Sequence, residues 1–233
     1  MSIMTKRNKK VVIYGVGDQA RIAQVYYGQD SEYQIEAFTV QEAYLTDTTL
    51  GGLSVVPFED VEEIYPPGEF AMFVAVGFAQ VNKIRSRIYD AAKEKGYELV
   101  SFLSSRIIQW GECQIGDNAF IVDDTVIHPF VTIGNDVCIS GRSIVGHDSV
   151  IGDHCFIGPN AVIAGRVTIG RHCFVGANST IRNGVTVAAE CVIGAGAIIL
   201  EDTREQGVYL APGTAAASIT SDLLTPFFGA TRR

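Results

Sequence analysis

The residues best suited to chemistry are an adjacent histidine and aspartate, in the stretch Gly146-His147-Asp148. Imidazole titrates near neutral pH, so it can accept a proton from an amine or a hydroxyl group. A carboxylate beside it can fix its tautomer and stabilise its protonated form. The pair therefore indicates a general base at His147 assisted by Asp148, although an outward-facing surface histidine would leave the same pattern.

The other histidines favour packing over metal binding. His154 and His172 lie 18 residues apart, so we expect them to stack on one face, as a surface or interface pair or as half of a metal site. His128 is more typical of a packed corner. A zinc hydratase of the γ-carbonic anhydrase type needs three converging histidines. Since the four histidines are spaced by 19, 7 and 18 residues and do not resemble that pattern, no metal is expected.

A strict six-residue period determines the architecture around His147. From Ile115 to Ile199 every sixth residue is Ile or Val, without exception over 15 positions. The fifth residue of each hexad is small or β-branched, and the residue after the aliphatic one is usually Gly or Ala. Hexads are typical of a β-helix in which three hexads close one triangular coil. We expect the aliphatic and fifth positions to point inward.

The cysteines follow the same period. Cys155, Cys173 and Cys191 are spaced by 18 residues at the fifth hexad position, which predicts reduced, inward-facing side chains. Buried thiols are inert, so an acetyl-cysteine intermediate is disfavoured relative to direct attack on the acyl donor.

The segment before the hexads alternates strands and helices. Apolar runs predict strands over 9–17, 33–40, 70–77 and 97–105, and helical spacing predicts a helix over 80–95. We expect Asp18 to cap a first helix that runs to about Tyr27 and is closed by Gly28. This order favours a small parallel, Rossmann-like α/β sheet.

Composition limits the partners and divides the chain. The formal net charge of −8 argues against nucleic acid or an anionic membrane as partner. No apolar run reaches the roughly 20 residues that cross a bilayer, so we expect a cytoplasmic protein. We predict an α/β substrate domain over 1–105, a β-helix acyltransferase domain over 106–200 and a C-terminal extension over 201–233. In that extension we expect 222–228 to cap the prism and 229–233 to be frayed.

The stretches "VVIYGVGDQA", "MFVAVG" and "IVGHDSVIGDHCFIGPNAVIAGRVTIG" together resemble the left-handed β-helix sugar acetyltransferases of the NeuD/PglD type. The resemblance implies a homotrimer that binds acetyl-CoA between neighbouring prisms and acetylates a sugar, usually an amino sugar on a nucleotide. By matching positions, it implies His147 as base with Asp148 beside it. It also implies that CoA is contacted by Gly165, Ala177 and Ala195. The loop that binds the nucleotide sugar would be formed by Gly17, Asp18 and Gln19.

Three positions depart from the family pattern. Gly17-Asp18-Gln19 stands where relatives carry Gly-Gly-His or Ser-Gly-His, and Thr39 and Val40 replace an acidic pair. A second family histidine near the acetyl group falls on Phe156. The "GVGD" stretch also lacks full dinucleotide spacing, so a plain strand-to-helix turn is an alternative interpretation of that loop. The identity of the nucleotide therefore stays open.

The resulting hypothesis is an acetyl-CoA-dependent N-acetyltransferase for a nucleotide-linked amino-deoxysugar, serving lipopolysaccharide, O-antigen or glycoconjugate synthesis. The acceptor would attack the thioester directly, with the Gly165 N–H receiving the oxyanion. Two alternatives remain at this point. One is an O-acetyltransferase of the sialic-acid type, and the other is a non-catalytic trimeric binding platform.

Overall fold

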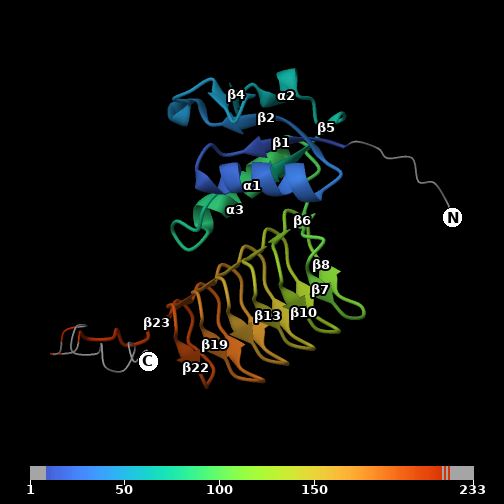
Figure 1. The fold of residues 1–233 in the computed structure, drawn as a ribbon. Helices are drawn as coiled ribbons and strands as arrows, with labels where there is room; N and C mark the ends of the chain where they lie inside the picture. The colour runs from blue at the N-terminus through green and yellow to red at the C-terminus, as the bar shows by residue number, and fades with distance from the viewer. Residues whose placement is uncertain (1–8, 217, 219, 221–233) are drawn as a thin grey trace, which may run out of the picture.

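The computed structural model describes residues 9–216, 218 and 220. It contains a small α/β unit that lies against a long triangular prism, and the prism's coils follow one another along a single axis (Figure 1). The proposed cap over 222–228 and the proposed frayed end over 229–233 lie outside the described residues.

The α/β unit is a five-stranded sheet in the order β3-β4-β2-β1-β5. All its neighbouring strands are parallel except the β3–β4 hairpin. The strands are β1 (Lys10–Tyr14), β2 (Gln34–Val40), β3 (Thr49–Leu50), β4 (Leu53–Pro57) and β5 (Phe70–Val74). The helices are α1 (Asp18–Asp30), the 3-10 turn η1 (Glu42–Tyr44), α2 (Val61–Ile64) and α3 (Lys83–Glu94).

Three local expectations were wrong. Asp18 does not cap α1, because Gly17 is the N-cap residue and Asp18 is the first helical residue. The helix also continues through Gly28 to Asp30, since burial of Tyr27 against the sheet outweighs the roughly 1 kcal/mol penalty of an internal glycine. The strand expected over 97–105 forms only in part: Leu99 makes an isolated parallel bridge to Met72 of β5, and β6 (Phe102–Leu103) pairs in the prism instead.

The prism is a left-handed parallel β-helix with three sheets, here called its first, second and third faces. The first face is β6, β9 (Phe120–Ile121), β12 (Cys138–Ile139), β15 (Phe156–Ile157), β18 (Phe174–Val175), β21 (Val192–Ile193) and β23 (Val208–Tyr209). The second face is β7 (Ile108–Gln109), β10 (Val126–Ile127), β13 (Ile144–Val145), β16 (Val162–Ile163), β19 (Thr180–Ile181) and β22 (Ile198–Ile199). The third face is β8 (Gln114–Ile115), β11 (Thr132–Ile133), β14 (Val150–Ile151), β17 (Thr168–Ile169) and β20 (Thr186–Val187).

The interior confirms the hexad assignment. From β9 to β22 the aliphatic positions and the fifth positions form one continuous buried core. Cys155, Cys173 and Cys191 are fully buried in it as free thiols. Burial raises the pKa of the Cys155 thiol, whereas the hydrogen bond with Cys155 lowers the pKa of the Cys173 thiol. All three side chains pack inside the prism.

The prism is longer than its period indicates. It begins two hexads earlier, with β6 and β7, where the hexad pattern is hidden because Gln109 occupies an aliphatic position. It ends with β23, which pairs with β21 at an offset of 16 residues because Val192 lies opposite Val208. Thus β6 and β23 pair in the prism although they lie in the predicted substrate domain and extension. The divisions at 105 and 200 remain predictions.

Each corner uses one residue in the left-handed backbone region. The fourth hexad position has positive φ in nearly every coil, including Asp136 (φ 54°), Asp148 (φ 58°) and His154 (φ 59°). Asn and Asp tolerate this conformation best, and it turns the chain toward the inward-facing fifth residue. The residues just before this position therefore project from the prism's edges.

Replacement of Ile163 by Asp tests the register. Because Ile163 is fully buried in an aliphatic column, an unpaired carboxylate there should cost more than about 4 kcal/mol and unfold the prism. Thermal melting followed by circular dichroism measures the loss.

The matched control is Val150→Asp, since Val150 faces outward on β14 and is 41% exposed. We expect a cost of about 1 kcal/mol or less for this change. Equal melting temperatures for the two variants would show that the inward and outward positions are misassigned.

Candidate active site

His147 and Asp148 meet at the corner between β13 and β14. The His147 Nδ1 atom lies 2.7 Å from Asp148 Oδ2, and the two side chains are 42% and 48% exposed. The left-handed backbone at Asp148 brings this carboxylate back beside the preceding side chain. With Nδ1–H donating to Asp148, the Nε2 atom keeps a free lone pair that can accept a proton.

Gly165 occupies the equivalent corner of the next coil and lies against the His147 ring. A Cβ atom built on Gly165 would stand 2.5 Å from His147 Nε2, so only glycine leaves room for the imidazole in this orientation. The Arg166 N–H donates to the His147 carbonyl at 2.7 Å, which fixes the two coils relative to each other. Within the described part of the chain the Gly165 N–H has no acceptor, and Gly165 itself is buried beside the His147 ring.

The structure places the other two expected CoA contacts on a different edge. Ala177 follows β18 and Ala195 follows β21, so both lie where the first face turns into the second. We call this the alanine edge, and the corner line of His147 and Gly165 the histidine edge. The second face separates the two edges, and six extended residues span up to about 20 Å. Within one chain, the predicted site residues therefore form two groups.

The loop Gly17-Asp18-Gln19 lines a pocket of about 980 Å³ at the carboxyl ends of β1, β2 and β5. Ligands of open parallel sheets bind at this end, where neighbouring crossovers diverge. The Asp18 side chain is 91% exposed, and Arg87 is the one cation among the pocket's lining residues. Thr39 is buried below the pocket and its hydroxyl donates to the Val56 carbonyl, so this hydroxyl is already engaged.

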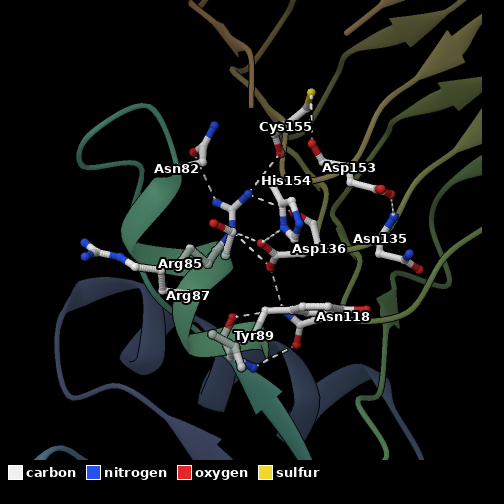
Figure 2. Close-up of polar contacts among 12 residues, drawn as sticks. Asn82, Arg85, Arg87, Tyr89, Asn118, Asn135, Asp136, Asp153, His154 and Cys155 are labelled. Carbon is white, nitrogen blue, oxygen red and sulfur yellow. Dashed lines mark hydrogen bonds and ion pairs between the residues drawn. The ribbon is translucent and has the colours of Figure 1, made fainter. Parts of the chain in front are cut away.

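A buried ion pair fixes this α/β unit on the prism (Figure 2). The Asp136 carboxylate accepts hydrogen bonds from Arg85 Nε at 2.9 and 3.0 Å, from Asn118 Nδ2 at 2.7 Å and from His154 Nδ1 at 2.9 Å. Arg85 and Asp136 are 1% and 0% exposed. Every partner comes from α3 or from a prism corner, so the network sets the position of α3, whose residues also line the pocket.

The stack of His154 on His172 is confirmed, with ring centroids 4.9 Å apart. The pair lies in the contact between α3 and the prism, where Tyr89 packs on His154. Burial and the neighbouring His154 lower the pKa of His172. No group of three potential metal ligands is found among the described residues, and the geometry of this pair is that of an interface.

Sequence reasoning missed Arg85 and Phe78. The hexad period does not predict the partner of Asp136, because Arg85 lies 51 residues earlier, on helix α3 of the α/β unit. Phe78 packs on Phe156, the position where relatives were expected to carry a second histidine, and on Phe174. An apolar cluster therefore replaces a polar group at that point.

Family models for transferase repeats match the prism. "Bacterial transferase hexapeptide (six repeats)" matches residues 148–183, and "Hexapeptide repeat of succinyl-transferase" matches residues 166–201. None of the curated proteins matches the chain in sequence.

Solved structures share the whole two-part fold. A variant of perosamine N-acetyltransferase from Caulobacter crescentus, in complex with CoA and GDP-perosamine, is 24% identical over 87% of this chain and 93% of that one, with a TM-score of 0.78. The acetyltransferase domain of PglB from Neisseria gonorrhoeae with acetyl coenzyme A is 22% identical over 88% and 97%, at 0.78. WeeI from Acinetobacter baumannii is 22% identical over 82% and 95%, at 0.61.

These comparisons define the class of protein by its fold. The chain has the left-handed β-helix fold, and hexapeptide repeats of the kind found in transferases match residues 148–201 of it. More particularly, its α/β unit and prism together match the folds of the perosamine N-acetyltransferase variant and of the PglB acetyltransferase domain. No helix among the described residues is long and apolar enough to span a membrane.

Gly165→Ala tests the contact between the two coils. The backbone angles of Gly165 suit alanine, but the new methyl group would displace the His147 ring. We expect the prism to fold normally and kcat to fall by about 10², the usual result of moving a catalytic group by about 1 Å. Steady-state kinetics with acetyl-CoA and an amino-sugar acceptor measures this.

Gly68→Ala is the control, because a Cβ atom there meets nothing within 4 Å. Full activity in Gly165→Ala, with melting temperatures equal to wild type, would remove the proposed constraint on His147.

Proposed function

We propose that this protein is an acetyltransferase that moves the acetyl group of acetyl-CoA to the amino group of a nucleotide-linked amino-deoxysugar. The observation that carries this proposal is the histidine edge. His147 is held by Asp148 at 2.7 Å, its Nε2 atom faces the coil of Gly165, and the Gly165 N–H has no acceptor among the described residues. The proposed base and the proposed oxyanion donor thus lie on one corner line of the prism, in consecutive coils.

The reaction is direct acyl transfer. The acceptor nitrogen attacks the thioester carbonyl carbon, and the carbonyl oxygen gains negative charge that the Gly165 N–H stabilises. His147 Nε2 takes one proton from the attacking nitrogen, and Asp148 stabilises the imidazolium that results. The C–S bond then breaks, and His147 returns the proton to the departing CoA sulfur. The products are an N-acetylated sugar and free CoA.

The pocket beside Gly17-Asp18-Gln19 supports a nucleotide-linked acceptor. Its volume of about 980 Å³ is large enough for a nucleotide sugar, and it opens at the ligand-binding end of the parallel sheet. Asp18 adds negative charge at the start of α1, where phosphate often binds, so Arg87 is the better placed partner for a diphosphate.

The second face of the prism supports a homotrimer with shared sites. Its outward residues are mostly aliphatic, whereas those of the third face are mostly threonine, as the strand sequences show: Ile108, Val126, Ile144, Val162, Thr180 and Ile198 against Gln114, Thr132, Val150, Thr168 and Thr186. The histidine edge and the alanine edge border this second face on opposite sides. A threefold arrangement with the second face turned inward would place the histidine edge of one subunit against the alanine edge of the next.

In that arrangement acetyl-CoA would lie between subunits. Ala177 and Ala195 of one chain would border the pantetheine, and His147 of its neighbour would reach the thioester. The acetylated nucleotide sugar suits transfer into a surface polysaccharide or glycoconjugate, including lipopolysaccharide O-antigen.

A thiol-release assay with acetyl-CoA tests the reaction. We expect turnover with at least one member of a panel of UDP-, dTDP- and GDP-linked 4-amino-6-deoxysugars. His147→Ala should lower kcat by about 10²–10⁴ with the oligomer intact, which is the usual contribution of a general base. His128→Ala, at a neighbouring corner, should retain full activity.

Loss of less than about fivefold in His147→Ala would remove His147 from the role of base. Turnover only with hydroxyl acceptors such as sialic acid would favour O-acetylation. Absence of turnover with every acceptor would favour the binding-platform alternative.

Subunit mixing tests the shared site. We expect His147→Ala and Ala177→Trp each to be inactive alone, the second because indole would occupy the alanine edge. Co-expressed in equal amounts, they should recover activity, because about one quarter of the interfaces would pair an intact histidine edge with an intact alanine edge.

Differently tagged subunits, purified through both tags in sequence, show whether mixed trimers have formed. Mixed trimers without any activity would place each site within a single chain.

A further inference from the structure

Phe78 is an exposed aromatic residue that lies between the nucleotide pocket and the prism. It belongs to the segment that leads from β5 into α3 and lines the pocket. The residue is 48% exposed. Its ring centroid lies 5.1 Å from that of Phe156 and 5.0 Å from that of Phe174. These two rings are stacked in parallel on the first face, 5.4 Å apart.

The backbone that follows Phe78 is strained. Gln80, Val81 and Asn82 have φ values of 52°, 52° and 63°, three successive non-glycine residues in the left-handed region. The conformation is especially unfavourable for a β-branched residue such as Val81. Strain of this kind persists only where surrounding contacts enforce it, and it is concentrated at functional sites.

The contacts that enforce it are buried and polar. Asn82 is fully buried, and its Nδ2 atom donates to the Cys173 carbonyl at 3.1 Å. One turn later Arg85 forms the ion pair with Asp136 and donates to the Cys155 carbonyl at 3.1 Å (Figure 2). Both anchors join the start of α3 to the coils that carry Phe156 and Phe174. The strained segment thus holds the Phe78 ring over the prism.

The position of this aromatic cluster relates it to both proposed substrates. Gly77, Phe78 and Ala79 line the pocket proposed for the nucleotide. Phe174 precedes Ala177 by three residues, so at most about 10 Å of chain separates the cluster from the alanine edge. A sugar that reaches from the nucleotide pocket toward the thioester would pass this apolar wall.

We propose that Phe78, backed by Phe156 and Phe174, binds the apolar face of the acceptor sugar and determines which sugar is accepted. The inference rests on the proposed function and adds a specificity-determining residue to it. The C–H face of a pyranose ring or a C6 methyl group would pack on Phe78 and bury apolar surface. A C6 hydroxyl group directed at the same wall would lose its hydrogen bonds to water without replacement. The site should therefore favour 6-deoxysugars.

The test compares matched acceptors on wild type and on Phe78→Ala. With the nucleotide that supports turnover, wild type should prefer the 4-amino-6-deoxysugar over its 6-hydroxy counterpart by about 10–100-fold in kcat/KM, the range that one group provides in an apolar pocket. Phe78→Ala should raise the KM for the 6-deoxysugar about tenfold and reduce the preference to about threefold or less. Its KM for acetyl-CoA should stay at the wild-type value.

Two further variants control for folding and for apolar area. Ile64→Ala removes an aliphatic side chain that is 50% exposed on α2 and does not line the pocket, and it should change neither preference nor KM. Phe78→Leu keeps an apolar contact and should retain part of the preference. Thermal melting of each variant confirms that the fold is intact.

The outcomes separate this inference from the proposed function. Wild type that turns over no amino sugar overturns the proposed function and this inference with it. Wild type that is active while Phe78→Ala keeps its acceptor KM and sugar preference overturns the role of Phe78 alone. An equal rise in the KM for acetyl-CoA would also contradict it, because it would indicate a general disturbance of the site.

Discussion

The constraint from which the rest of the structure follows is the parallel pairing of prism strands 18 residues apart, which holds for every pair except β21 with β23. Each strand is only two residues long, so no single pair is stable by itself, and stability comes from the continuous inner column that the pairing creates. The register fixes the inward positions and leaves the outward-facing strand positions and the corners free to vary. Those corners are where His147, Gly165 and Ala177 lie, and a shift of one residue would turn the interior outward.

Asp136 is a corner residue that also holds the α/β unit on the prism. The left-handed position suits aspartate, and the carboxylate there is fully buried beneath α3. Its hydrogen bonds to Arg85, Asn118 and His154 satisfy a charge that would otherwise be costly to bury. Such pairs contribute more to orientation than to net stability. Here the orientation concerns the α/β unit, because the ion pair fixes α3, and residues of α3 line the pocket.

The two edges that border the second face divide the proposed chemistry. In the proposed function the histidine edge would supply the base and the oxyanion donor, and the alanine edge would supply a narrow ridge of backbone along which acetyl-CoA could lie. Gly158 and Gly176 support that ridge, since a Cβ atom on either would come within 2.8 Å of the backbone nitrogen of the next coil. If the proposed trimer forms, this division would make the oligomer part of the site and would relate the apolar second face to catalysis as well as to assembly.

The prism, its inward positions and the stacking of His154 on His172 could be predicted from the sequence alone, because a fixed period makes residues 18 positions apart neighbours in space. The contact of His147 with Asp148 could also be predicted, because the two residues are adjacent in the chain. The sequence did not reveal the first coil, where Gln109 interrupts the pattern, or the end of α1, where packing of Tyr27 overrides a local stop signal. Only the tertiary structure joined Arg85 to Asp136 and placed Phe78 on Phe156. Those contacts link segments with no common period, so they depend on how two separately folded surfaces fit together.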